Sequence, residues 1–265
     1  MKRLTVCADD FGNSPGTSAA IAELIGAGRI NATSCMAISP GWPDDWLLLE
    51  PLRKRAAIGL HLTLTSAAPL TAMPCYAPTR MMPGIDAVAR NRRLPLDEIA
   101  TEIAAQFERF EAIAGSPPDF VDGHQHVHHL PTIRGLVMAE TRRRAPRAWL
   151  RDCGDSWRGL LSRPFRAKAF ASALRGRGFG AAARRAGLAT NNGFAGHYDF
   201  GERFAALLPA FLSVAGDHHL VMVHPGSDEL AGDPIGAARV REAAVLRGID
   251  IAGLAIAHGL ELNRP

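Results

Sequence analysis

Short runs of apolar residues alternate along this chain with longer segments in which apolar residues recur every three or four positions. The short runs are typical of buried strands, and the longer segments are typical of amphipathic helices. The clearest helix covers 96–114, where Ile99, Ile103, Phe107 and Phe110 recur at helical spacing. Strands are predicted at 3–8, 31–38, 58–64, 148–151, 188–192 and 220–223, with one more beginning at residue 120.

Helices predicted between these strands complete a strand–helix alternation that repeats about seven times. They cover 15–28, 43–56, 96–114, 131–144, 201–214 and 236–247. The proline-rich segment 66–95 is predicted to be a long loop, and the Arg-, Ala- and Gly-rich segment 157–187 could be helical or mobile. The alternation predicts a parallel sheet covered by helices. Because no glycine-rich nucleotide-binding motif is present, a barrel-like (TIM-like) closure that forms one domain over residues 1–265 is favoured over an open nucleotide-binding sheet.

Reactive side chains lie at the ends of the predicted strands or within one of them. Barrels of this kind place their chemistry at the carboxyl ends of the strands. We therefore expect six side chains from distant parts of the sequence to converge on one pocket. They are Asp9, Asp10, His61, His124, Arg151 and His224.

Residues 124–129 contain four of the ten histidines of the chain. If the strand continued, His124, His126 and His128 would share one face, because side chains in a strand alternate with period two. A purely structural cluster would need a separate hydrogen-bond partner for each buried imidazole, so a functional site is favoured. Asp122 precedes the cluster and could orient one of its imidazoles.

The other candidates also have structural interpretations. Asp9 and Asp10 could begin a turn, but two carboxylates after a buried strand are costly unless they are paired or bind a cation. Taken alone, His61 is more often a core histidine, and its place in a barrel strand is what favours the pocket. Arg151 could form a salt bridge, and His224 could be a turn residue.

The polar turn around residue 191 offers weaker candidates. Asn191, Asn192 and His197 could bind substrate hydroxyls, and Asn192 is retained as a candidate, although a simple loop role is favoured for all three.

One carboxylate and two imidazoles leave open positions on a divalent ion, which is typical of a catalytic metal site. Such an ion lowers the pKa of bound water and polarises a carbonyl oxygen. A second carboxylate can act as base, a distant histidine can protonate a leaving amine, and an arginine can hold the base ionised. The set predicts a hydrolase for an amide or ester bond.

The composition argues against several other classes of protein and leaves the predicted hydrolase unchanged. Apolar residues make up 47% and charged residues 21%, no apolar run is long enough to span a bilayer, and the expected location is the cytoplasm. The four cysteines are too widely spaced for a disulfide framework or a zinc knuckle. The net charge of +4 comes almost entirely from arginine, and the basic stretches lack interleaved aromatics, so a solvated basic face is favoured over nucleic-acid binding.

Four segments, in order, carry a resemblance to the YdjC-like carbohydrate deacetylases (the ChbG/HpnK group) that spans nearly the whole chain. They are Ala-Asp-Asp-Phe-Gly at 8–12, Gly-Leu-His-Leu-Thr-Leu-Thr at 59–65, Asp-Gly-His-Gln-His-Val-His at 122–128 and Met-Val-His-Pro-Gly at 222–226. A further segment, 69–74, resembles the chitooligosaccharide branch of the family.

The resemblance implies a distorted barrel related to the NodB-type deacetylases. It implies metal-dependent removal of acetyl from an N-acetylated sugar, such as diacetylchitobiose, or from an N-acetylglucosaminyl glycolipid. By motif, Asp10, His61 and His124 would hold the metal, Asp9 would be the base, and His224 would be the acid. The family implies Mg²⁺, whereas two imidazole ligands suit Zn²⁺ better on ligand softness.

Analogy with the NodB type implies that Arg151 orients the base, and it leaves His126 and His128 near the metal or the substrate. The family often has Ser-His-His-His-Val-His where this chain has Gly-His-Gln-His-Val-His at 123–128, so substrate contacts can differ. A metallophosphoesterase and a non-catalytic sugar- or metal-binding protein are the alternatives. A homodimer is left open.

Overall fold

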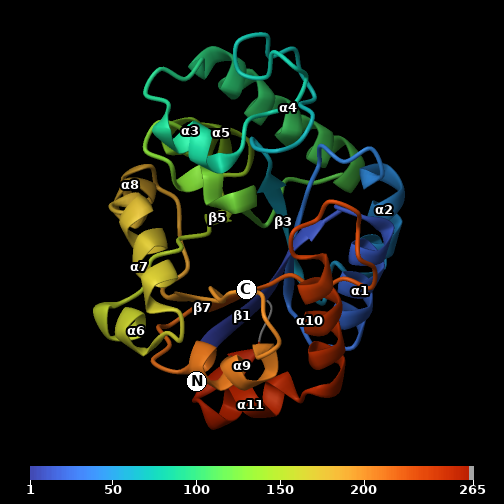
Figure 1. Cartoon of the computed structure of the whole chain (residues 1–265), viewed down its shortest axis with the longest axis vertical. Helices are drawn as coiled ribbons and strands as arrows, with labels where there is room; N and C mark the ends of the chain where they lie inside the picture. The colour runs from blue at the N-terminus through green and yellow to red at the C-terminus, as the bar shows by residue number, and fades with distance from the viewer. Residues whose placement is uncertain (263–265) are drawn as a thin grey trace.

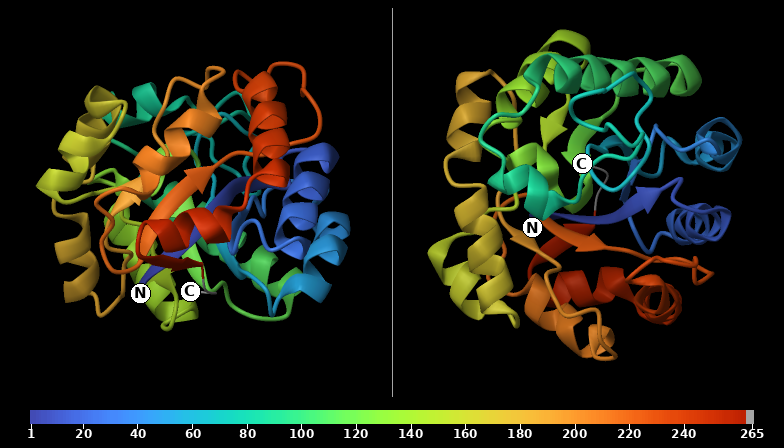
Figure 2. Two further views of the ribbon diagram at one scale, coloured as in Figure 1. Left: turned by 90° about the horizontal axis from the view of Figure 1, so that it is seen from below. Right: turned by 45° about the horizontal axis from the view of Figure 1, so that its top comes forward.

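A computed structural model of the chain describes residues 1–262. All its paired strands are parallel, and seven of them follow the order β5-β4-β3-β2-β1-β7-β6, with β8 added beside the start of β1. The strands are β1 (Lys2–Phe11), β2 (Ala32–Cys35), β3 (Ala57–Leu62), β4 (Phe120–Gly123), β5 (Trp149–Leu150), β6 (Phe194–Ala195), β7 (His219–Val223) and β8 (Leu260–Leu262). The sheet curls into an incomplete barrel whose helices lie around the outside (Figures 1 and 2).

The helices connect successive strands, as parallel pairing requires. They are α1 (Pro15–Gly26), α2 (Trp42–Leu49), η1 (Glu50–Leu52), α3 (Ile85–Arg90), α4 (Leu96–Ala114), η2 (His124–His129), α5 (Arg134–Arg144), α6 (Trp157–Ser162), α7 (Arg166–Arg175), α8 (Phe179–Arg185), α9 (Phe204–Leu212), α10 (Gly236–Gly248) and α11 (Ile251–Ala257). None of the helices in the described part of the chain is both long and apolar enough to cross a bilayer.

The predicted distorted (β/α) barrel is confirmed, with corrections to several elements. The strand expected at 188–192 is instead β6 at Phe194–Ala195, and only Thr190 of the expected segment forms an isolated bridge, to Leu150. The helix expected over 43–56 divides into α2 and η1 at Pro51, which cannot donate a backbone hydrogen bond. The single-domain boundary remains a prediction, and residues 263–265 lie outside the described part.

Segments without clear periodicity contain helices. The long loop expected over 66–95 is largely irregular but includes α3, and segment 157–187 forms α6, α7 and α8. The short tail expected after residue 247 contains α11 and β8.

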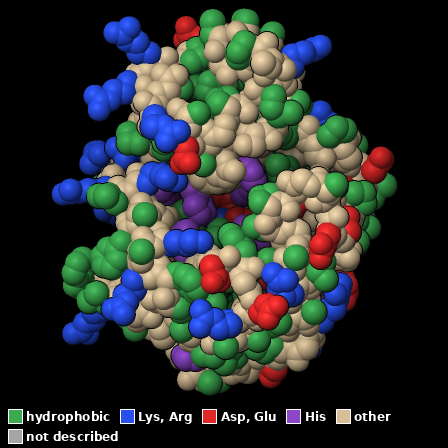
Figure 3. All heavy atoms as spheres, in the orientation of Figure 1, with side chains coloured by type: hydrophobic (Ala, Val, Ile, Leu, Met, Phe, Trp, Pro, Cys, Tyr) green, Lys and Arg blue, Asp and Glu red, His purple; other side chains and the backbone are tan. Residues whose placement is uncertain are grey.

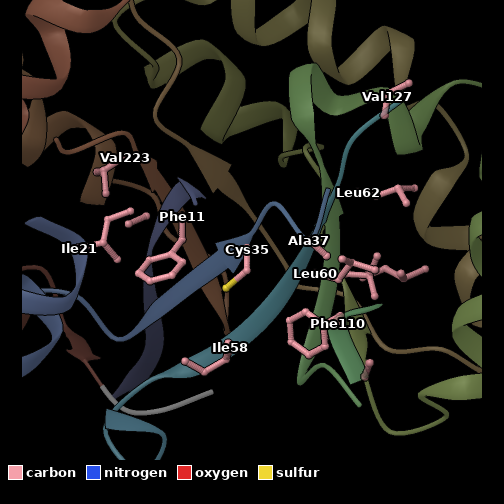
Figure 4. Packing of buried hydrophobic residues seen from close by; sticks show 14 of the residues in the cluster. Phe11, Ile21, Cys35, Ala37, Ile58, Leu60, Leu62, Phe110, Val127 and Val223 are labelled. Atoms are coloured by element: carbon pink, nitrogen blue, oxygen red, sulfur yellow. The ribbon is translucent and has the colours of Figure 1, made fainter. Parts of the chain in front are cut away.

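Two apolar layers fix the position of β1 at the centre of the sheet. On the outer face, Leu4, Val6 and Ala8 belong to the main core between the sheet and its helices, which Figure 4 shows around Phe11, Ile21 and other residues. On the inner face, Cys7 belongs to a second cluster that fills the base of the barrel. Side chains alternate along a strand, so the side chain after Cys7 on the inner face is that of Asp9.

Close packing inside the barrel demands a glycine on β3. The rings of Phe120 and Trp149 stack with their centroids 4.4 Å apart. A Cβ at Gly59 would lie 2.5 Å from the ring of Phe120. The absence of a side chain at this position therefore allows β3 and β4 to pair directly over the stacked rings.

Candidate active site

A cleft of about 730 Å³ opens at the carboxyl ends of the central strands. In Figure 3 the face of the molecule is hollowed at its centre, and histidine and acidic side chains are visible inside the hollow. Its lining brings together five of the six expected strand-end residues: Asp9, Asp10, His61, His124 and His224. The sixth, Arg151, lies fully buried directly behind Asp9. Residues from four distant strands therefore converge as the parallel topology predicts.

A bulge allows two consecutive aspartates to face the same cleft. The register of β1 against β2 shifts between Ala8 and Phe11, and Asp10 takes a left-handed backbone conformation with φ of 65°. In a regular strand Asp9 and Asp10 would point to opposite faces. The bulge turns Asp10 towards the cleft, so that both side chains line it.

Asp10 is the meeting point of two imidazoles. Its Oδ1 lies 3.1 Å from Nε2 of His61 and 3.0 Å from Nδ1 of His124. One ligand atom from each of these three residues lies within 4.8 Å of the others. His124 stands at the end of β4 and is partly open to the cleft, whereas Asp10 and His61 are buried.

The ring of His61 is held from its far side. Its Nδ1 lies 2.7 Å from Oδ1 of Asp122 and 2.9 Å from the hydroxyl of Ser34. A carboxylate on the second nitrogen is the usual way in which a metal-binding imidazole is oriented. Burial lowers the pKa of His61, but Asp122 and Asp10 outweigh that effect and raise the pKa to about 10. The surroundings of His61 thus strongly favour a positive charge at this point.

Arg239 of α10 supports Asp10 from the other side. Its Nη2 donates to Oδ2 of Asp10 over 2.7 Å, and its Nε donates to Asp233 over 2.6 Å. Burial raises the pKa of Asp10, but Arg239 and His124 outweigh it and hold the pKa well below the usual range. Asp10 is therefore an ionised carboxylate with one oxygen fixed by Arg239 and the other directed towards the imidazoles.

A second arginine, Arg151, forms an ion pair with Asp9. The guanidinium of Arg151 donates to Asp9 over 2.6 and 2.5 Å, and the same group lies 2.5 Å from Oδ2 of Asp122. Burial raises the pKa of Asp9, but Arg151 outweighs it and lowers the pKa below the ordinary value. Arg151 is itself fully buried between these carboxylates. Asp9 is consequently ionised, oriented and open to the cleft.

His224 lies at the end of β7 and also lines the cleft. Its backbone N–H donates to Oε2 of Glu242 over 2.5 Å, and the hydroxyl of Tyr198 donates to Oε1 of Glu242 over 2.5 Å. Burial lowers the pKa of His224 to about 4, although Asp9 and Asp10 oppose this effect. A neutral imidazole close to two ionised carboxylates is the resting arrangement.

The histidine cluster does not continue β4, which corrects the expectation that His124, His126 and His128 share one face. The ladder between β3 and β4 ends at the pair Leu62–Gly123, so no partner holds the next residues extended. The chain enters η2 instead, with Gln125 and His126 at positive φ. His126 reaches the cleft, whereas His128 is buried away from it.

His128 and His129 act on the backbone of the neighbouring strand. Nε2 of each lies 3.0 Å from the carbonyl oxygen of Arg151. Burial lowers the pKa of both rings, so each is neutral. Nε2 of His128 can donate to that oxygen, whereas Nε2 of His129 also accepts from the backbone N–H of Cys153 over 3.3 Å. The two residues fix the segment that carries the Arg151 side chain.

Asn192 lies apart from the cleft, contrary to its selection as a substrate contact. It is exposed, and its backbone N–H donates to the carbonyl of His218, at the amino end of β7 and therefore far from the carboxyl edge. Asn191 is buried and donates to the carbonyls of Asp152 and Gly193. Of the three polar-turn residues, only His197 lines the cleft.

Arg239 and Glu242 are the site residues that the sequence pattern missed. Both lie in α10, where they are separated by three positions and face the sheet. The only available signal was the presence of two ionisable residues on the apolar face of a predicted helix, which is rare unless both are paired.

The three donors Asp10, His61 and His124 fit a divalent cation. They provide one carboxylate and two imidazoles. The carboxylate of Asp122, bonded to the far nitrogen of His61, orients that ring as is usual in metal sites. The described residues include two further donor groups, but members of each already contact Arg151. His128 and His129 bond to Arg151, and the group of Cys7, Asp9 and Asp122 surrounds the Arg151 guanidinium.

Fold and site together define an α/β half-barrel protein with a carboxylate–histidine cluster, able to hold a cation, at the carboxyl edge of its sheet. The chain belongs to the YdjC-like protein family, whose model matches residues 3–254. The family expected from the four sequence motifs is thereby confirmed.

Two curated relatives show what the chain resembles. It is 34% identical over 143 residues to a chitooligosaccharide deacetylase of Proteus mirabilis (strain HI4320), which covers 54% of this chain and 56% of that protein. It is 37% identical over 146 residues to a chitooligosaccharide deacetylase of Yersinia pestis (strain Pestoides F), with 54% and 57% covered. The chain thus spans about half the length of the curated relatives it matches.

Solved structures share the fold. A protein of Enterococcus faecalis V583 described as a candidate cellobiose-phosphate cleavage protein superposes with a TM-score of 0.74 at 20% identity, over 99% of this chain and 97% of that one. The peptidoglycan N-acetylglucosamine deacetylase Bc1960 superposes with a TM-score of 0.53 at 10% identity, over 99% and 85%. The expected relation to the NodB-type fold is confirmed at the level of architecture.

Proposed function

We propose that this protein is a hydrolase that removes the N-acetyl group from an N-acetylated sugar of the chitooligosaccharide type or from an N-acetylglucosaminyl glycolipid. One observation carries the proposal. Two consecutive aspartates face one cleft, and each is held by its own arginine, so that one is free to bind a cation while the other can accept a proton. The curated relatives named as chitooligosaccharide deacetylases support the substrate class.

Asp10, His61 and His124 would hold one divalent cation, either Mg²⁺ or Zn²⁺. When bound, such an ion supplies Lewis acidity towards a carbonyl oxygen and makes a water molecule more acidic. The two imidazoles favour Zn²⁺ on ligand softness, and Mg²⁺ is the ion that the family resemblance implies.

Two other side chains that line the same cleft, Asp9 and His224, would move the protons. Asp9 accepts a proton from the attacking water while the oxygen of that water bonds to the acetyl carbon. The bond between that carbon and nitrogen then breaks, and His224 delivers a proton to the departing amine, which leaves acetate and a free amino sugar. Because the pKa of His224 lies near 4, its resting ring is neutral. The proton taken up by Asp9 therefore has to reach His224 during each cycle. The two groups are close enough that each shifts the pKa of the other.

Arg151 would keep Asp9 in place during this exchange. Both oxygens of Asp9 accept hydrogen bonds from the guanidinium of Arg151, so the carboxylate cannot rotate away from the cleft. A bidentate contact to a planar guanidinium fixes direction as well as charge.

The same arginine argues against the metallophosphoesterase alternative. A two-metal phosphatase would need Asp9 or Asp122 as ligands of a second ion. The guanidinium of Arg151 already lies 2.5 Å from an oxygen of each, so a second cation there would be repelled. The observed donor set therefore supports one ion.

Acetate release from diacetylchitobiose, measured with added Mg²⁺ or Zn²⁺ after chelation, tests the proposal. Asp9→Asn keeps the size of the side chain but removes the base, and we expect acetate release to fall by about a hundredfold or more. Asp10→Asn is expected to raise the metal concentration needed for activity. The matched control is Asp44→Asn, the same change at an exposed position of α2.

Unchanged acetate release by Asp9→Asn, on a substrate that the wild type turns over, would remove the proposed base. Turnover of simple phosphate esters without acetate release would favour the phosphoesterase instead. Tight sugar binding without turnover under either metal would indicate a non-catalytic binding protein.

A further inference from the structure

Segment 156–198 has an unusual charge composition. It contains eight Arg or Lys residues and not a single Asp or Glu. The whole chain carries a net charge of +4, so the remaining residues together carry −4. Of the eight, Arg163 is buried against Asp155, and the other seven are exposed: Arg158, Arg166, Lys168, Arg175, Arg177, Arg184 and Arg185.

Large apolar side chains are exposed among these cations. Trp157 is 68% exposed, Leu161 47% and Leu174 70%. Trp157 and Leu161 are four residues apart on α6, and Phe170 and Leu174 are four apart on α7, so each pair shares one helix face. The rings of Trp157 and Phe170 meet edge to face at 5.4 Å and join the two pairs. We call these four residues, with the exposed cations of α6 and α7, the basic apolar face.

This face adjoins the cleft. Lys168 of α7 lines the cleft and donates to the carbonyl of Tyr198 over 2.7 Å. Figure 3 shows basic side chains along the left side of the molecule, with hydrophobic side chains among them at the lower left, near α6 and α7. A partner that covers the face would therefore lie next to the entrance of the site.

We propose that the basic apolar face binds the surface of a membrane that contains anionic phospholipids. The interface of a bilayer combines negative headgroups with a shallow apolar layer, and helices that bind it present Lys or Arg beside Trp, Phe and Leu. Each component has its counterpart here. The arginines match the headgroups, and Trp157, Leu161 and Leu174 match the apolar layer.

Other occupants fit the face less well. In a symmetric dimer the same patch would meet itself and place like charges opposite one another. A nucleic acid would use the cations but would leave Leu161 and Leu174 without apolar contacts. The membrane surface is the occupant that uses both features.

The test is sedimentation of the full chain with phosphatidylcholine vesicles that contain either no phosphatidylglycerol or about one third of it. We expect binding only to the anionic vesicles, with weakening as salt rises. Trp157 supplies an independent signal because the other three tryptophans, Trp42, Trp46 and Trp149, are at most 8% exposed. Its fluorescence emission should shift to the blue on binding.

Matched variants separate this face from the general charge of the chain. Arg158→Glu with Arg166→Glu should weaken vesicle binding by at least about 25-fold, because each cation near the surface contributes about fivefold. Arg92→Glu with Arg93→Glu makes the same change of charge at an exposed site elsewhere and should have a much smaller effect. Leu174→Glu should also reduce binding, whereas Leu47→Glu, at a residue 64% exposed on α2, should not.

Equal loss in the Arg92/Arg93 variant would overturn the proposal, as would equal binding to neutral vesicles or an unchanged Trp157 emission. Binding to DNA or a concentration-dependent dimer that the Leu174→Glu variant abolishes, in the absence of vesicle binding, would assign the face to another partner. Far-UV circular dichroism confirms that each variant is folded. None of these measurements depends on the proposed deacetylase activity.

Discussion

Arg151 offers a quantitative test of how the candidate site is built. Its guanidinium is fully buried and contacts Asp9 twice and Asp122 once. Arg151→Met would remove the arginine from Asp9 and leave His61 as the remaining counter-charge of Asp122, and removal of one partner from a buried ion pair costs about 3–5 kcal/mol. Arg151→Lys retains the charge but loses the bidentate geometry, so we expect a smaller loss of about 1.5–3 kcal/mol, the usual value for hydrogen bonds to charged groups.

Urea unfolding measures these losses directly. The matched control is Arg247→Lys, which breaks a bidentate contact with Glu23 on the surface. That pair is 40% and 53% exposed, so its loss should cost well under 1 kcal/mol because solvent screens it. For a chain of this length, the expected loss for Arg151→Lys corresponds to a fall in Tm of about 3–12 °C.

The sign of the pH dependence gives a second readout. Because Arg151 holds the pKa of Asp9 below its ordinary value, Asp9 stabilises the wild type above pH 4 and loses this contribution as the pH falls through the folded pKa. Without Arg151, we expect burial, the largest influence on Asp9, to outweigh the remaining effects of His61 and His224 and to raise the pKa of Asp9 above the unfolded value. The Met variant should therefore lose stability as pH increases. An Arg151→Lys cost no larger than that of Arg247→Lys, or an unchanged pH slope in the Met variant, would refute this account of the site.

Three further predictions concern the packing of Gly59, the candidate cation ligands and the buried Glu242. Gly59→Ala should destabilise the fold by about 1–3 kcal/mol in urea unfolding because of the Phe120 ring, whereas Gly135→Ala, with nothing within 4 Å, should be neutral or stabilising. Binding of Zn²⁺ at pH 8 should release a proton from His61, whose pKa is about 10; calorimetry in buffers of different ionisation enthalpy measures it, and no release would contradict the ligand assignment. Burial raises the pKa of Glu242 to about 7, so stability should fall as pH rises from 4.5 to 7, and Glu242→Gln should remove that part of the slope. An identical slope in the variant would show that Glu242 is already ionised in this range.

Much of the fold was predictable because its strands are continuous apolar runs. The strands ending near Asp10 and Val223 are long and hydrophobic, and both were located within a few residues. β5 and β6 contain only two residues each, which is too short to give a periodic signal. The sequence therefore placed β5 because of Trp149 and Leu150 but misplaced β6 by several residues.

The site was predictable where a residue follows a strand and not where it approaches from a helix. Asp9, Asp10, His61, His124 and His224 meet because parallel strands end at one edge. Arg239 reaches Asp10 across 229 positions of sequence, and no local pattern reveals such a contact. The turn at Gln125 and His126 depends on where the β3–β4 ladder stops, which is a property of two strands rather than of one.

The bulge at Asp10 restricts which side chains can stand there. The left-handed conformation, with φ of 65°, is adopted far more readily by Asp, Asn and Gly than by Glu or β-branched residues. A glutamate could still carry the negative charge, but it would strain the backbone and place its carboxylate one methylene further from the main chain, out of the position that Asp10 holds against His61 and His124. The same position therefore meets two independent demands, one on backbone conformation and one on chemistry. Aspartate satisfies both, which leaves this position little freedom to vary even among residues that bind cations.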